Sequence, residues 1–577
     1  MTDPTLPSLP QALARANIWL MAGAALSLLA WVLPNRDPPW VSFYNEWAMA
    51  VAVWMLAAWQ LARSRGPVVV PGTAGVLLAV AALPLLQAAA GVVEQMGDAT
   101  VAAAMVAGLA AAVVVGRHWC AHAPHEAPSA LWTTLLAAGL LSSGLALAQW
   151  LRLEGLGVLL ADLPAGSRPT GNISQANHLG SLLVWSLLGL WAAVRTGHVR
   201  PAWALPTAAL LLFCAAATQS RTVWLNLALL ALGGLVWRRH LLPTRAGIAA
   251  LAGLGLWFAC LVLAWPSLNA ALGQPPGLAS DAAMSAGLRP GLWRIAMAAI
   301  GDGAWHGWGW TQFSLAQQAQ ALEMPAVHRV FTYAHNLALD LAIWNGPVPG
   351  AVLAGLLAIW CARRARRVVT APAALAALGI GVLLVHAQVE MPHAYAYFLL
   401  PAGLMAGQLL ALEARARPPV DGPAARHRTQ AVAWLVLALV GGLLVVLLRD
   451  YRHIEIRLHQ ERYRAARVGQ PIDTPPPAPW LLTQFEGFWP AMRQRPTAGM
   501  GGDELQVLAA AARRFPSGPL QFKLALAQAR NGRPLEARHT LALLQAMQRA
   551  TEADRARAAW QALGADDPAV QAVPWPR

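Results

Sequence analysis

The stretch AVAWLVLALVGGLLVVLL, residues 431–448, decides the fold class. It is an uninterrupted run without charge, close to the roughly 20 residues that a helix needs to cross the hydrocarbon core of a bilayer. Similar runs recur along the 577-residue chain, which has 57% hydrophobic and 12% charged residues and a mean hydropathy of +0.46. Soluble proteins carry roughly 25% charged residues. The composition therefore excludes a soluble enzyme, a disordered chain and a fibrous protein, and predicts an all-α polytopic membrane protein.

Apolar windows bounded by charge, proline or glycine predict about thirteen transmembrane helices. They lie near residues 15–34, 46–63, 68–92, 99–117, 129–150, 174–195, 201–219, 221–237, 246–266, 346–362, 371–390, 394–412 and 430–448. Arginine clusters follow the even-numbered windows: Arg63 with Arg65, Arg195 with Arg200, Arg238 with Arg239 and Arg245, Arg363 to Arg367, and Arg415, Arg417, Arg426 and Arg428. The positive-inside rule places these loops and the N-terminus in the cytoplasm. An odd number of spans then leaves the C-terminal tail outside.

The net charge and the cysteines argue against nucleic-acid binding, a disulfide framework and a zinc site. The net charge of +15 comes from 42 basic and 27 acidic residues, and most of the excess lies in those short loop clusters. Membrane topology explains the excess better than nucleic-acid binding does. The four cysteines, Cys120, Cys214, Cys260 and Cys361, lie far apart without metal-ligand spacing. We interpret them as packing residues, with no disulfide framework and no zinc site. Residues 1–17 lack a secretory cleavage pattern, so the first window is expected to be a retained helix.

Three stretches on the outer side are long enough to carry function: 151–173, a loop at about 266–345, and the tail 450–577. We therefore divide the chain into a transmembrane domain, 1–449, and an outer C-terminal domain, 450–577. The tail has two amphipathic stretches about a turn at Asn531–Gly532, weakly similar to one tetratricopeptide hairpin. One such repeat cannot bury its own apolar face. The tail is thus either a small helical domain or a surface for a partner.

The start of the sixth window, SRPTGNISQANHLG, is unusually polar. It contains Arg168, Asn172, Gln175, Asn177 and His178. Asn172 or Ser174 could cap the helix, which would explain one of these residues. Gln175 and His178 are three residues apart and are expected to share one helical face. The group indicates either a site for a polar, anionic ligand or hydrogen bonding between helices.

Four arginines are expected on the outer side without matching acids: Arg168, Arg221, Arg289 and Arg294. Arg221 lies in the short turn TQSRT between two windows, and the last two lie in GLRPGLWR within the large loop. Such an arginine either reaches toward lipid phosphate or binds a specific phosphate as a bidentate fork. Four together favour an anion of diphosphate size.

Two further segments place polar groups at helix starts on the same side. VFTYAHNLALDLAIWNG contains His335 and Asn336 before an apolar stretch. His335 is either a cap or packing residue, or a base that takes a proton from a hydroxyl near neutral pH. HAQVEMPHAYAYFLL contains Glu390 and Tyr395. Glu390 could pair with an arginine or orient an imidazole, and the alternative is an interfacial loop with a tyrosine belt.

Taken in order, RPTGNISQANHLG, SRT, RPGLWR, GWGWTQF, AHNLALDLAIWNG and EMPHAYAYFLLP resemble the PglL-type O-linked oligosaccharyltransferases. These belong to the O-antigen ligase and Wzy polymerase superfamily. PPWVSFYNEWAMA and PLLQAAAGVVEQMGDA resemble the first outer loop and third helix of that family, so the likeness spans about residues 30–410. It implies a multi-pass enzyme of the bacterial inner membrane with its active site facing the periplasm. The enzyme would move a preassembled glycan from undecaprenyl diphosphate to a Ser or Thr hydroxyl of an exported protein such as pilin.

The resemblance also implies catalytic roles for His335, Gln175 and Tyr395, with Asn177, His178, Asn336 and Glu390 in support. A diphosphate is already a good leaving group, so the reaction needs anion stabilisation and a positioned hydroxyl. Our hypothesis is that Arg168, Arg221, Arg289 and Arg294 share the diphosphate while His335 takes the acceptor proton, with inversion at the anomeric carbon and without metal or cofactor. The alternatives are an O-antigen ligase with a lipid A core acceptor, a Wzy-type polymerase, a transporter or flippase for lipid-linked glycans, and a non-catalytic envelope assembly protein.

Overall fold

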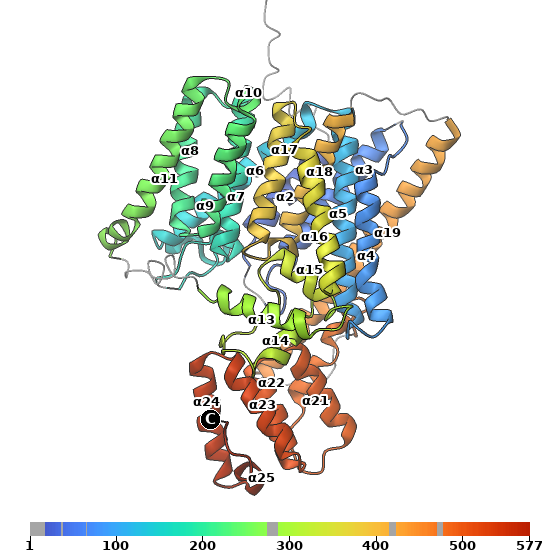
Figure 1. Cartoon of the computed structure of the whole chain (residues 1–577), viewed down its shortest axis with the longest axis vertical. Coiled ribbons are helices and arrows are strands. Elements are labelled where there is room, and N and C mark those ends of the chain that lie inside the picture. Colours follow the sequence, from blue (N-terminus) through green and yellow to red (C-terminus); the bar gives the residue numbers. More distant parts are fainter. Residues whose placement is uncertain are drawn as a thin grey trace, which may run out of the picture. The chain divides into compact units, whose positions relative to one another are not determined.

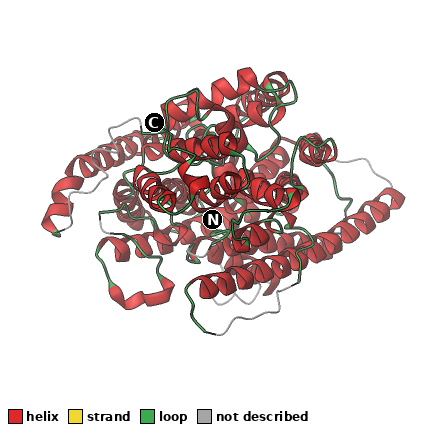
Figure 2. Cartoon of the chain, turned by 90° about the horizontal axis from the view of Figure 1, so that it is seen from below, coloured by secondary structure: helices red, strands yellow, loops and turns green. Residues whose placement is uncertain are grey.

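The computed structural model describes residues 18–35, 38–64, 66–164, 166–273, 287–414, 423–469 and 477–576. These ranges are helical, with short 3-10 turns and no β-strand (Figure 2). The predicted all-α class is therefore confirmed. The predicted cytoplasmic N-terminus, together with Arg65, Arg415 and Arg417, lies outside the described residues, as does part of the large loop.

The chain forms two compact units. The first comprises Met1–Val80, Met105–Ser285 and Trp360–Leu448, and the second comprises Ala81–Ala104, Ala286–Ile359 and Arg449–Arg577. One border, between Leu448 and Arg449, falls one residue before the predicted boundary between residues 449 and 450. The second unit, however, contains residues 287–345 of the large loop as well as the tail, and the two-domain assignment stays a prediction.

Ten helices lie in the first unit: α2 (Ile18–Val32), α3 (Phe43–Arg63), α6 (Glu126–Trp150), α7 (Ala176–Arg195), α8 (Pro201–Ala217), α9 (Arg221–Val236), α10 (Arg238–Leu241), α11 (Arg245–Ala271), α17 (Ala371–Ala387) and α18 (Ala396–Ala414). Nine lie in the second: α13 (Arg289–Asp302), α14 (Phe313–Gln320), α15 (Leu337–Asn345), α20 (Phe488–Arg493), α21 (Gly502–Arg514), α22 (Gly518–Arg530), α23 (Pro534–Met547), α24 (Ala550–Gly564) and α25 (Pro568–Gln571). Four helices contribute residues to both units: α4 (Gly72–Ala89), α5 (Met96–His122), α16 (Pro347–Ala365) and α19 (Pro423–Ala465). These counts cover the described ranges only.

Every window predicted from the sequence contains a helix. Among the described helices, eight are long and apolar enough to cross a membrane: α4, α5, α6, α7, α11, α16, α18 and α19. Four more, α2, α8, α9 and α17, are apolar but shorter. A polytopic membrane protein is therefore confirmed, whereas thirteen spans stay a prediction.

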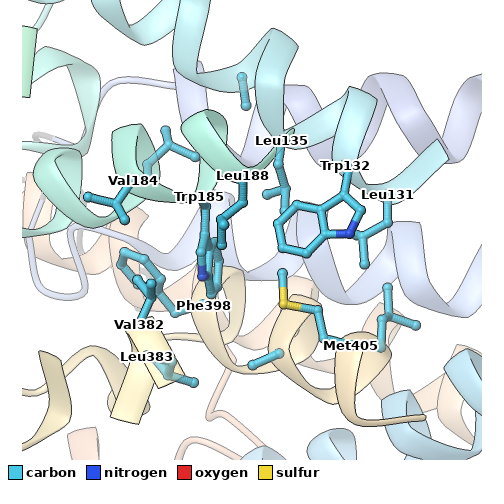
Figure 3. Close-up of a cluster of buried hydrophobic side chains, with 14 of the residues drawn as sticks. Leu131, Trp132, Leu135, Val184, Trp185, Leu188, Val382, Leu383, Phe398 and Met405 are labelled. Carbon is cyan, nitrogen blue, oxygen red and sulfur yellow. The ribbon is translucent and has the colours of Figure 1, made fainter. Parts of the chain in front are cut away.

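The core of the first unit surrounds α7, which is buried along most of its length. Figure 3 shows Trp185 of α7 beside Phe398 of α18. Trp132 of α6 and Met405 of α18 lie farther along the same core. Glycines let the neighbouring backbones approach. A methyl group at Gly189 would lie 2.5 Å from the carbonyl oxygen of Trp132, so α6 packs directly on α7. This close packing gives the polar side chains near the start of α7 a fixed setting.

The tail forms several helices with apolar cores of its own. Helices α22 and α23 flank the predicted turn at Asn531–Gly532, where Gly532 has a φ of 72°. Leu508 of α21 and Leu520 of α22 are buried in one cluster, and Leu541 of α23 and Trp560 of α24 in a second. Neighbouring helices thus cover the face that a single hairpin would leave exposed. The tail is therefore helical with buried apolar clusters, and its assignment as a separate domain stays a prediction.

Candidate functional site

The residues just before α7 differ from the prediction in two ways. Gln175 is the N-cap residue, with extended φ and ψ of −142° and 119°, so it does not share a helical face with His178. Asn172 does not cap the helix either. Its side chain holds the preceding loop together, donating to the carbonyl oxygens of Val32 and Leu159 and accepting from the backbone N–H of Ala161. The left-handed φ of 59° at Ser174 turns the chain between that loop and Gln175.

Asn177 joins three segments through one buried amide. Its Nδ2 donates to Oε1 of Glu390 at 2.9 Å, and its Oδ1 accepts from Oγ of Ser220 at 2.7 Å. Glu390 lies in the connection between α17 and α18, and Ser220 is the residue immediately before Arg221 at the start of α9. All three side chains are buried. Of the two predicted alternatives for this stretch, hydrogen bonding between helices is therefore present at Asn177.

His178 contacts the tyrosines that begin α18. Its Nδ1 lies 3.1 Å from the hydroxyl of Tyr397, and its ring centroid lies 4.6 Å from that of Tyr395 in an edge-to-face arrangement. A tyrosine hydroxyl, whose usual pKa is about 10, is neutral at physiological pH and can donate or accept a hydrogen bond.

Sequence reasoning missed Ser181 and Asn226, which extend this network. Oγ of Ser181 lies 2.8 Å from Nδ1 of His386 and accepts from Nδ2 of Asn226 at 3.1 Å. The signal was present for Ser181, which follows Asn177 by four residues and His178 by three, the spacing of one helical face. Nothing local indicated Asn226.

Glu46 was also missed, although an acid inside a predicted transmembrane window is itself a sign of function. Its carboxylate accepts from Nε1 of Trp40 at 2.7 Å, Oγ of Ser42 at 2.6 Å and the backbone N–H of Ala396 at 3.2 Å. The last bond is made to the residue that directly follows Tyr395. Glu46 therefore holds the backbone beside this tyrosine.

Arg168 and Arg221 both lie at the turn between α8 and α9. Nη1 of Arg168 donates to the carbonyl oxygen of Gln219 at 3.3 Å, and Arg221 is the first residue of α9, two positions later. Gln219 has a φ of 45°, a left-handed conformation that surrounding contacts must maintain in a residue other than glycine. Two of the four predicted arginines thus lie at one short connection in the first unit.

The other two arginines begin α13 in the second unit. Arg289 is the first residue of this helix, and Arg294 is exposed with its Nε donating to the carbonyl oxygen of Pro290 at 3.3 Å. Helix α13 packs on the segment before His335, because Nε1 of Trp293 donates to the carbonyl oxygen of Ala334 at 3.1 Å. The predicted convergence of all four arginines beside His335 involves residues of both units and stays a prediction.

His335 has a left-handed backbone, with a φ of 56°, immediately before α15. Its Nδ1 lies 3.0 Å from the carbonyl oxygen of Tyr333, a contact that requires a proton on Nδ1 and leaves Nε2 as the basic nitrogen of the neutral ring. The cap of α15 is Asn336, whose side chain accepts from the backbone N–H of Leu339 at 3.1 Å. His335 is therefore not the capping residue of α15, and a packing role and a catalytic role both stay open for it.

Buried polar groups hold the peptide before His335. Oδ1 of Asp340 accepts from the backbone N–H of Ala334 at 2.7 Å, and the Asp340 side chain is fully buried. Burial raises the pKa of Asp340 to about 8. Phe331 contacts the His335 ring edge-on at 5.3 Å between centroids. Within the described residues, no group of three His, Cys, Asp or Glu side chains is placed to hold a metal ion, and metal independence stays a prediction.

Two family models match different parts of this chain. Residues 206–354 match the family described as O-antigen ligase, and residues 373–563 match the family described as virulence factor membrane-bound polymerase, C-terminal. The first match contains Arg221, Arg289, Arg294 and His335. The second contains Glu390, Tyr395 and most of the tail.

Two curated proteins of Acinetobacter baylyi are similar to this chain. A general O-oligosaccharyltransferase is 29% identical over 401 residues, which cover 68% of this chain and 70% of that protein. A ComP-specific O-oligosaccharyltransferase is 26% identical over 244 residues, which cover 42% of this chain and 44% of that protein. The predicted resemblance is thereby confirmed, and an enzyme is favoured over a transporter. The chain is a membrane glycosyltransferase that is similar to O-oligosaccharyltransferases and, over residues 206–354, to the O-antigen ligase family.

Proposed function

We propose that this protein transfers a preassembled glycan from undecaprenyl diphosphate to Ser or Thr hydroxyls of exported proteins such as pilin. The reaction would take place at the periplasmic face of the bacterial inner membrane. The observation that carries the proposal is the match over 401 residues to a general O-oligosaccharyltransferase. That protein is named for transfer to hydroxyl oxygen, and its match extends over two thirds of this chain.

On the donor side, the developing charge is that of the departing diphosphate. Fixed guanidinium groups stabilise such charge without reorganising during the reaction. Arg168 bonds the carbonyl oxygen of Gln219 in the turn before α9, and Arg221 is the first residue of α9. Arg289 and Arg294 lie on α13, the helix that packs on the His335 segment. We assign all four to the diphosphate. In this proposal the guanidinium groups neutralise the charge of the leaving diphosphate, so the chemistry needs no metal ion.

On the acceptor side, Nε2 of His335 takes the hydroxyl proton as the oxygen attacks the anomeric carbon. The contact between Nδ1 and the Tyr333 carbonyl supports this role, because it holds the ring in the tautomer that a base requires. The bond from the anomeric carbon to the diphosphate oxygen breaks as the new glycosidic bond forms, which inverts the configuration. Gln175 and the neutral Tyr395 hydroxyl orient the reactants by hydrogen bonding.

The test is a reconstituted transfer assay with undecaprenyl-diphosphate-linked oligosaccharide and the purified full-length chain. Three acceptors are compared: a pilin-like protein, lipid A core, and the lipid-linked glycan itself. We expect a mass increment on a Ser or Thr peptide of the protein acceptor. Transfer only to lipid A core would instead identify an O-antigen ligase, and lengthening of the lipid-linked glycan would identify a polymerase.

Two further arms test the mechanism. His335→Ala should remove most of the transfer activity while leaving donor binding intact, whereas unchanged transfer would show that the base is another group. EDTA should have no effect on the wild-type rate. Loss of activity in EDTA that a divalent cation restores would contradict the metal-independent mechanism.

A further inference from the structure

The tail is bonded to the connection between α4 and α5 and to the first turn of α5, which are far from it in the sequence but in the same unit. Nε and Nη2 of Arg514, at the end of α21, donate to the two carboxylate oxygens of Asp98 at 2.5 and 2.6 Å. The Asp98 side chain is only 7% exposed. Arg513 forms a second ion pair with Glu94. At Gly97 a methyl group would lie 2.8 Å from the backbone nitrogen of Thr483, so the two segments are in direct contact.

The tail also bonds to the segment that leads to His335. Nε2 of Gln318, on α14, donates to the carbonyl oxygen of Arg513 at 2.9 Å. The backbone N–H of His328 donates to the carbonyl oxygen of Ala546, near the end of α23, at 3.1 Å. Figure 1 shows α14 next to the helices of the tail within this unit. The tail thus contacts both α14 and the chain that runs from α14 to His335.

Helix α14 links the tail to the segment that leads to His335. Gln317, adjacent to Gln318, accepts from the backbone N–H of Phe331 at 2.9 Å and donates to the carbonyl oxygen of Arg329 at 2.7 Å. At the other end of the helix, Gln312 accepts from the backbone N–H of Glu94 at 2.8 Å. Residues 94–98, α14 and the tail therefore form a closed set of contacts around residues 329–331, four to six positions before His335.

We propose that the tail helices α21 to α23 are a positioning element for His335, with Arg514 as the positioning residue that holds them to Asp98. The inference rests on the proposed function and adds a role for the tail within the catalytic unit. A left-handed residue such as His335 persists only where its surroundings determine its conformation. Breaking the buried Arg514–Asp98 pair would leave a carboxylate uncompensated and loosen the contacts around residues 329–331.

The alternative role, docking of the acceptor protein, makes a different kinetic prediction. A docking surface would lower the KM for a folded protein acceptor and would not matter for a short peptide that carries the same Ser. A positioning element would matter equally for both acceptors and would act on kcat. The two roles therefore separate in a comparison of acceptor size.

The experiment measures kcat and KM for both acceptors with full-length variants. We expect Arg514→Glu to lower kcat about 10- to 100-fold with either acceptor, because a displacement of about 1 Å can cost that much in rate. The double variant Asp98→Arg with Arg514→Glu should recover most of the lost rate. The control is Arg557→Glu, which breaks an exposed pair with Asp554 inside α24 at 3.2 Å and should leave kcat unchanged.

Gln318→Ala provides a second, milder variant in case charge reversal prevents folding. It removes one bond between α14 and the tail, and it should lower kcat while speeding hydrogen exchange in residues 326–336. The proposal is overturned if folded Arg514→Glu or Gln318→Ala keeps the wild-type kcat on the short peptide and changes only the KM for the protein acceptor. If the wild-type chain transfers glycan to neither acceptor, the proposed function itself fails, and this outcome is distinct.

Discussion

The polar network around Asn177 and the segment around His335 hold their side chains in different ways. The Asn177 network links helices α7, α9 and α18 and the end of α17, and its members are buried and hydrogen-bonded to one another. His335 lies between helices, is half-buried and has a left-handed backbone. Helix packing fixes the side chains of the Asn177 network. The His335 segment is held instead by bonds from the side chains of Asp340, Trp293 and Gln317 to its backbone.

This difference predicts that the Asn177 network contributes mainly to stability and the His335 segment mainly to the reaction rate. Buried interhelical hydrogen bonds mainly affect stability, since breaking one leaves polar groups without a partner in an apolar setting. A strained residue in a loop adds little to stability and is a frequent property of groups that act on substrate. Substitutions in the two regions should therefore separate into effects on unfolding and effects on rate.

The largest effect should come from His335→Ala. We expect kcat to fall about 10²- to 10⁴-fold, the usual contribution of a general base, with little change in Tm. The measurement is single-turnover transfer together with thermal unfolding in detergent. A large fall in Tm with a proportionate loss of folded enzyme would mean that His335 is structural, and the comparison between the two regions would fail.

Asn177→Leu tests the other region and should act mainly on stability. It removes one hydrogen bond from Glu390 and one from Ser220, both buried, which we expect to cost about 1–3 kcal/mol in the free energy of unfolding. Thr134→Val is the matched control, because the hydroxyl of Thr134 donates to the carbonyl oxygen of Ala130 within its own helix. An unchanged Tm with reduced transfer would place Asn177 with the reacting groups instead.

The thermal stability of the protein should also depend on pH through Asp340, which holds the His335 segment. Burial raises the pKa of Asp340 from 3.8 to about 8, so folding favours the protonated acid. The stability that this proton provides is complete below the unfolded pKa and is lost as the pH rises through about 8. Asp340→Asn keeps an oxygen to accept from Ala334 and cannot ionise, so its Tm should decline less than that of the wild type over this range. Parallel Tm curves for the two proteins would rule out this assignment.

The smallest effect should come from Ser181→Ala. Ser181 bonds His386 and Asn226 at the edge of the Asn177 network. Interhelical hydrogen bonds in membranes average about 0.6 kcal/mol, so we expect a loss of roughly that size for each bond, seen as a small fall in Tm. A rate change larger than that of Asn177→Leu would show that the network is also tuned for catalysis.

Much of the fold could be predicted because transmembrane helices are coded by local runs of apolar residues. Boundaries were less predictable. The window 430–448 is part of α19, which extends from Pro423 to Ala465. The short helices α13 and α14 in the large loop were not predicted, since their sequences combine apolar, aromatic and polar residues without a long run, whereas α15 follows His335 and Asn336 as expected.

The candidate site could be predicted in its members but not in its contacts. Asn177, Glu390 and His335 were recognised because polar residues at the ends of apolar windows are costly without a role. The bond between Asn177 and Glu390 joins positions 213 residues apart, and no local pattern indicates such a pair. Gln175 was placed one step too far into the helix, because the left-handed turn at Ser174 delays its start.

The sequence alone determined the membrane class, the number of apolar windows, the family resemblance and most of the residues proposed to act, because hydrophobic length and ordered motifs are properties of the chain itself. Only the tertiary structure decided which polar groups meet: Asn177 with Ser220 and Glu390, Glu46 with the backbone after Tyr395, and Arg514 with Asp98. Such pairs form because a polar group removed from water must find a partner wherever packing brings one, and packing depends on the whole chain at once.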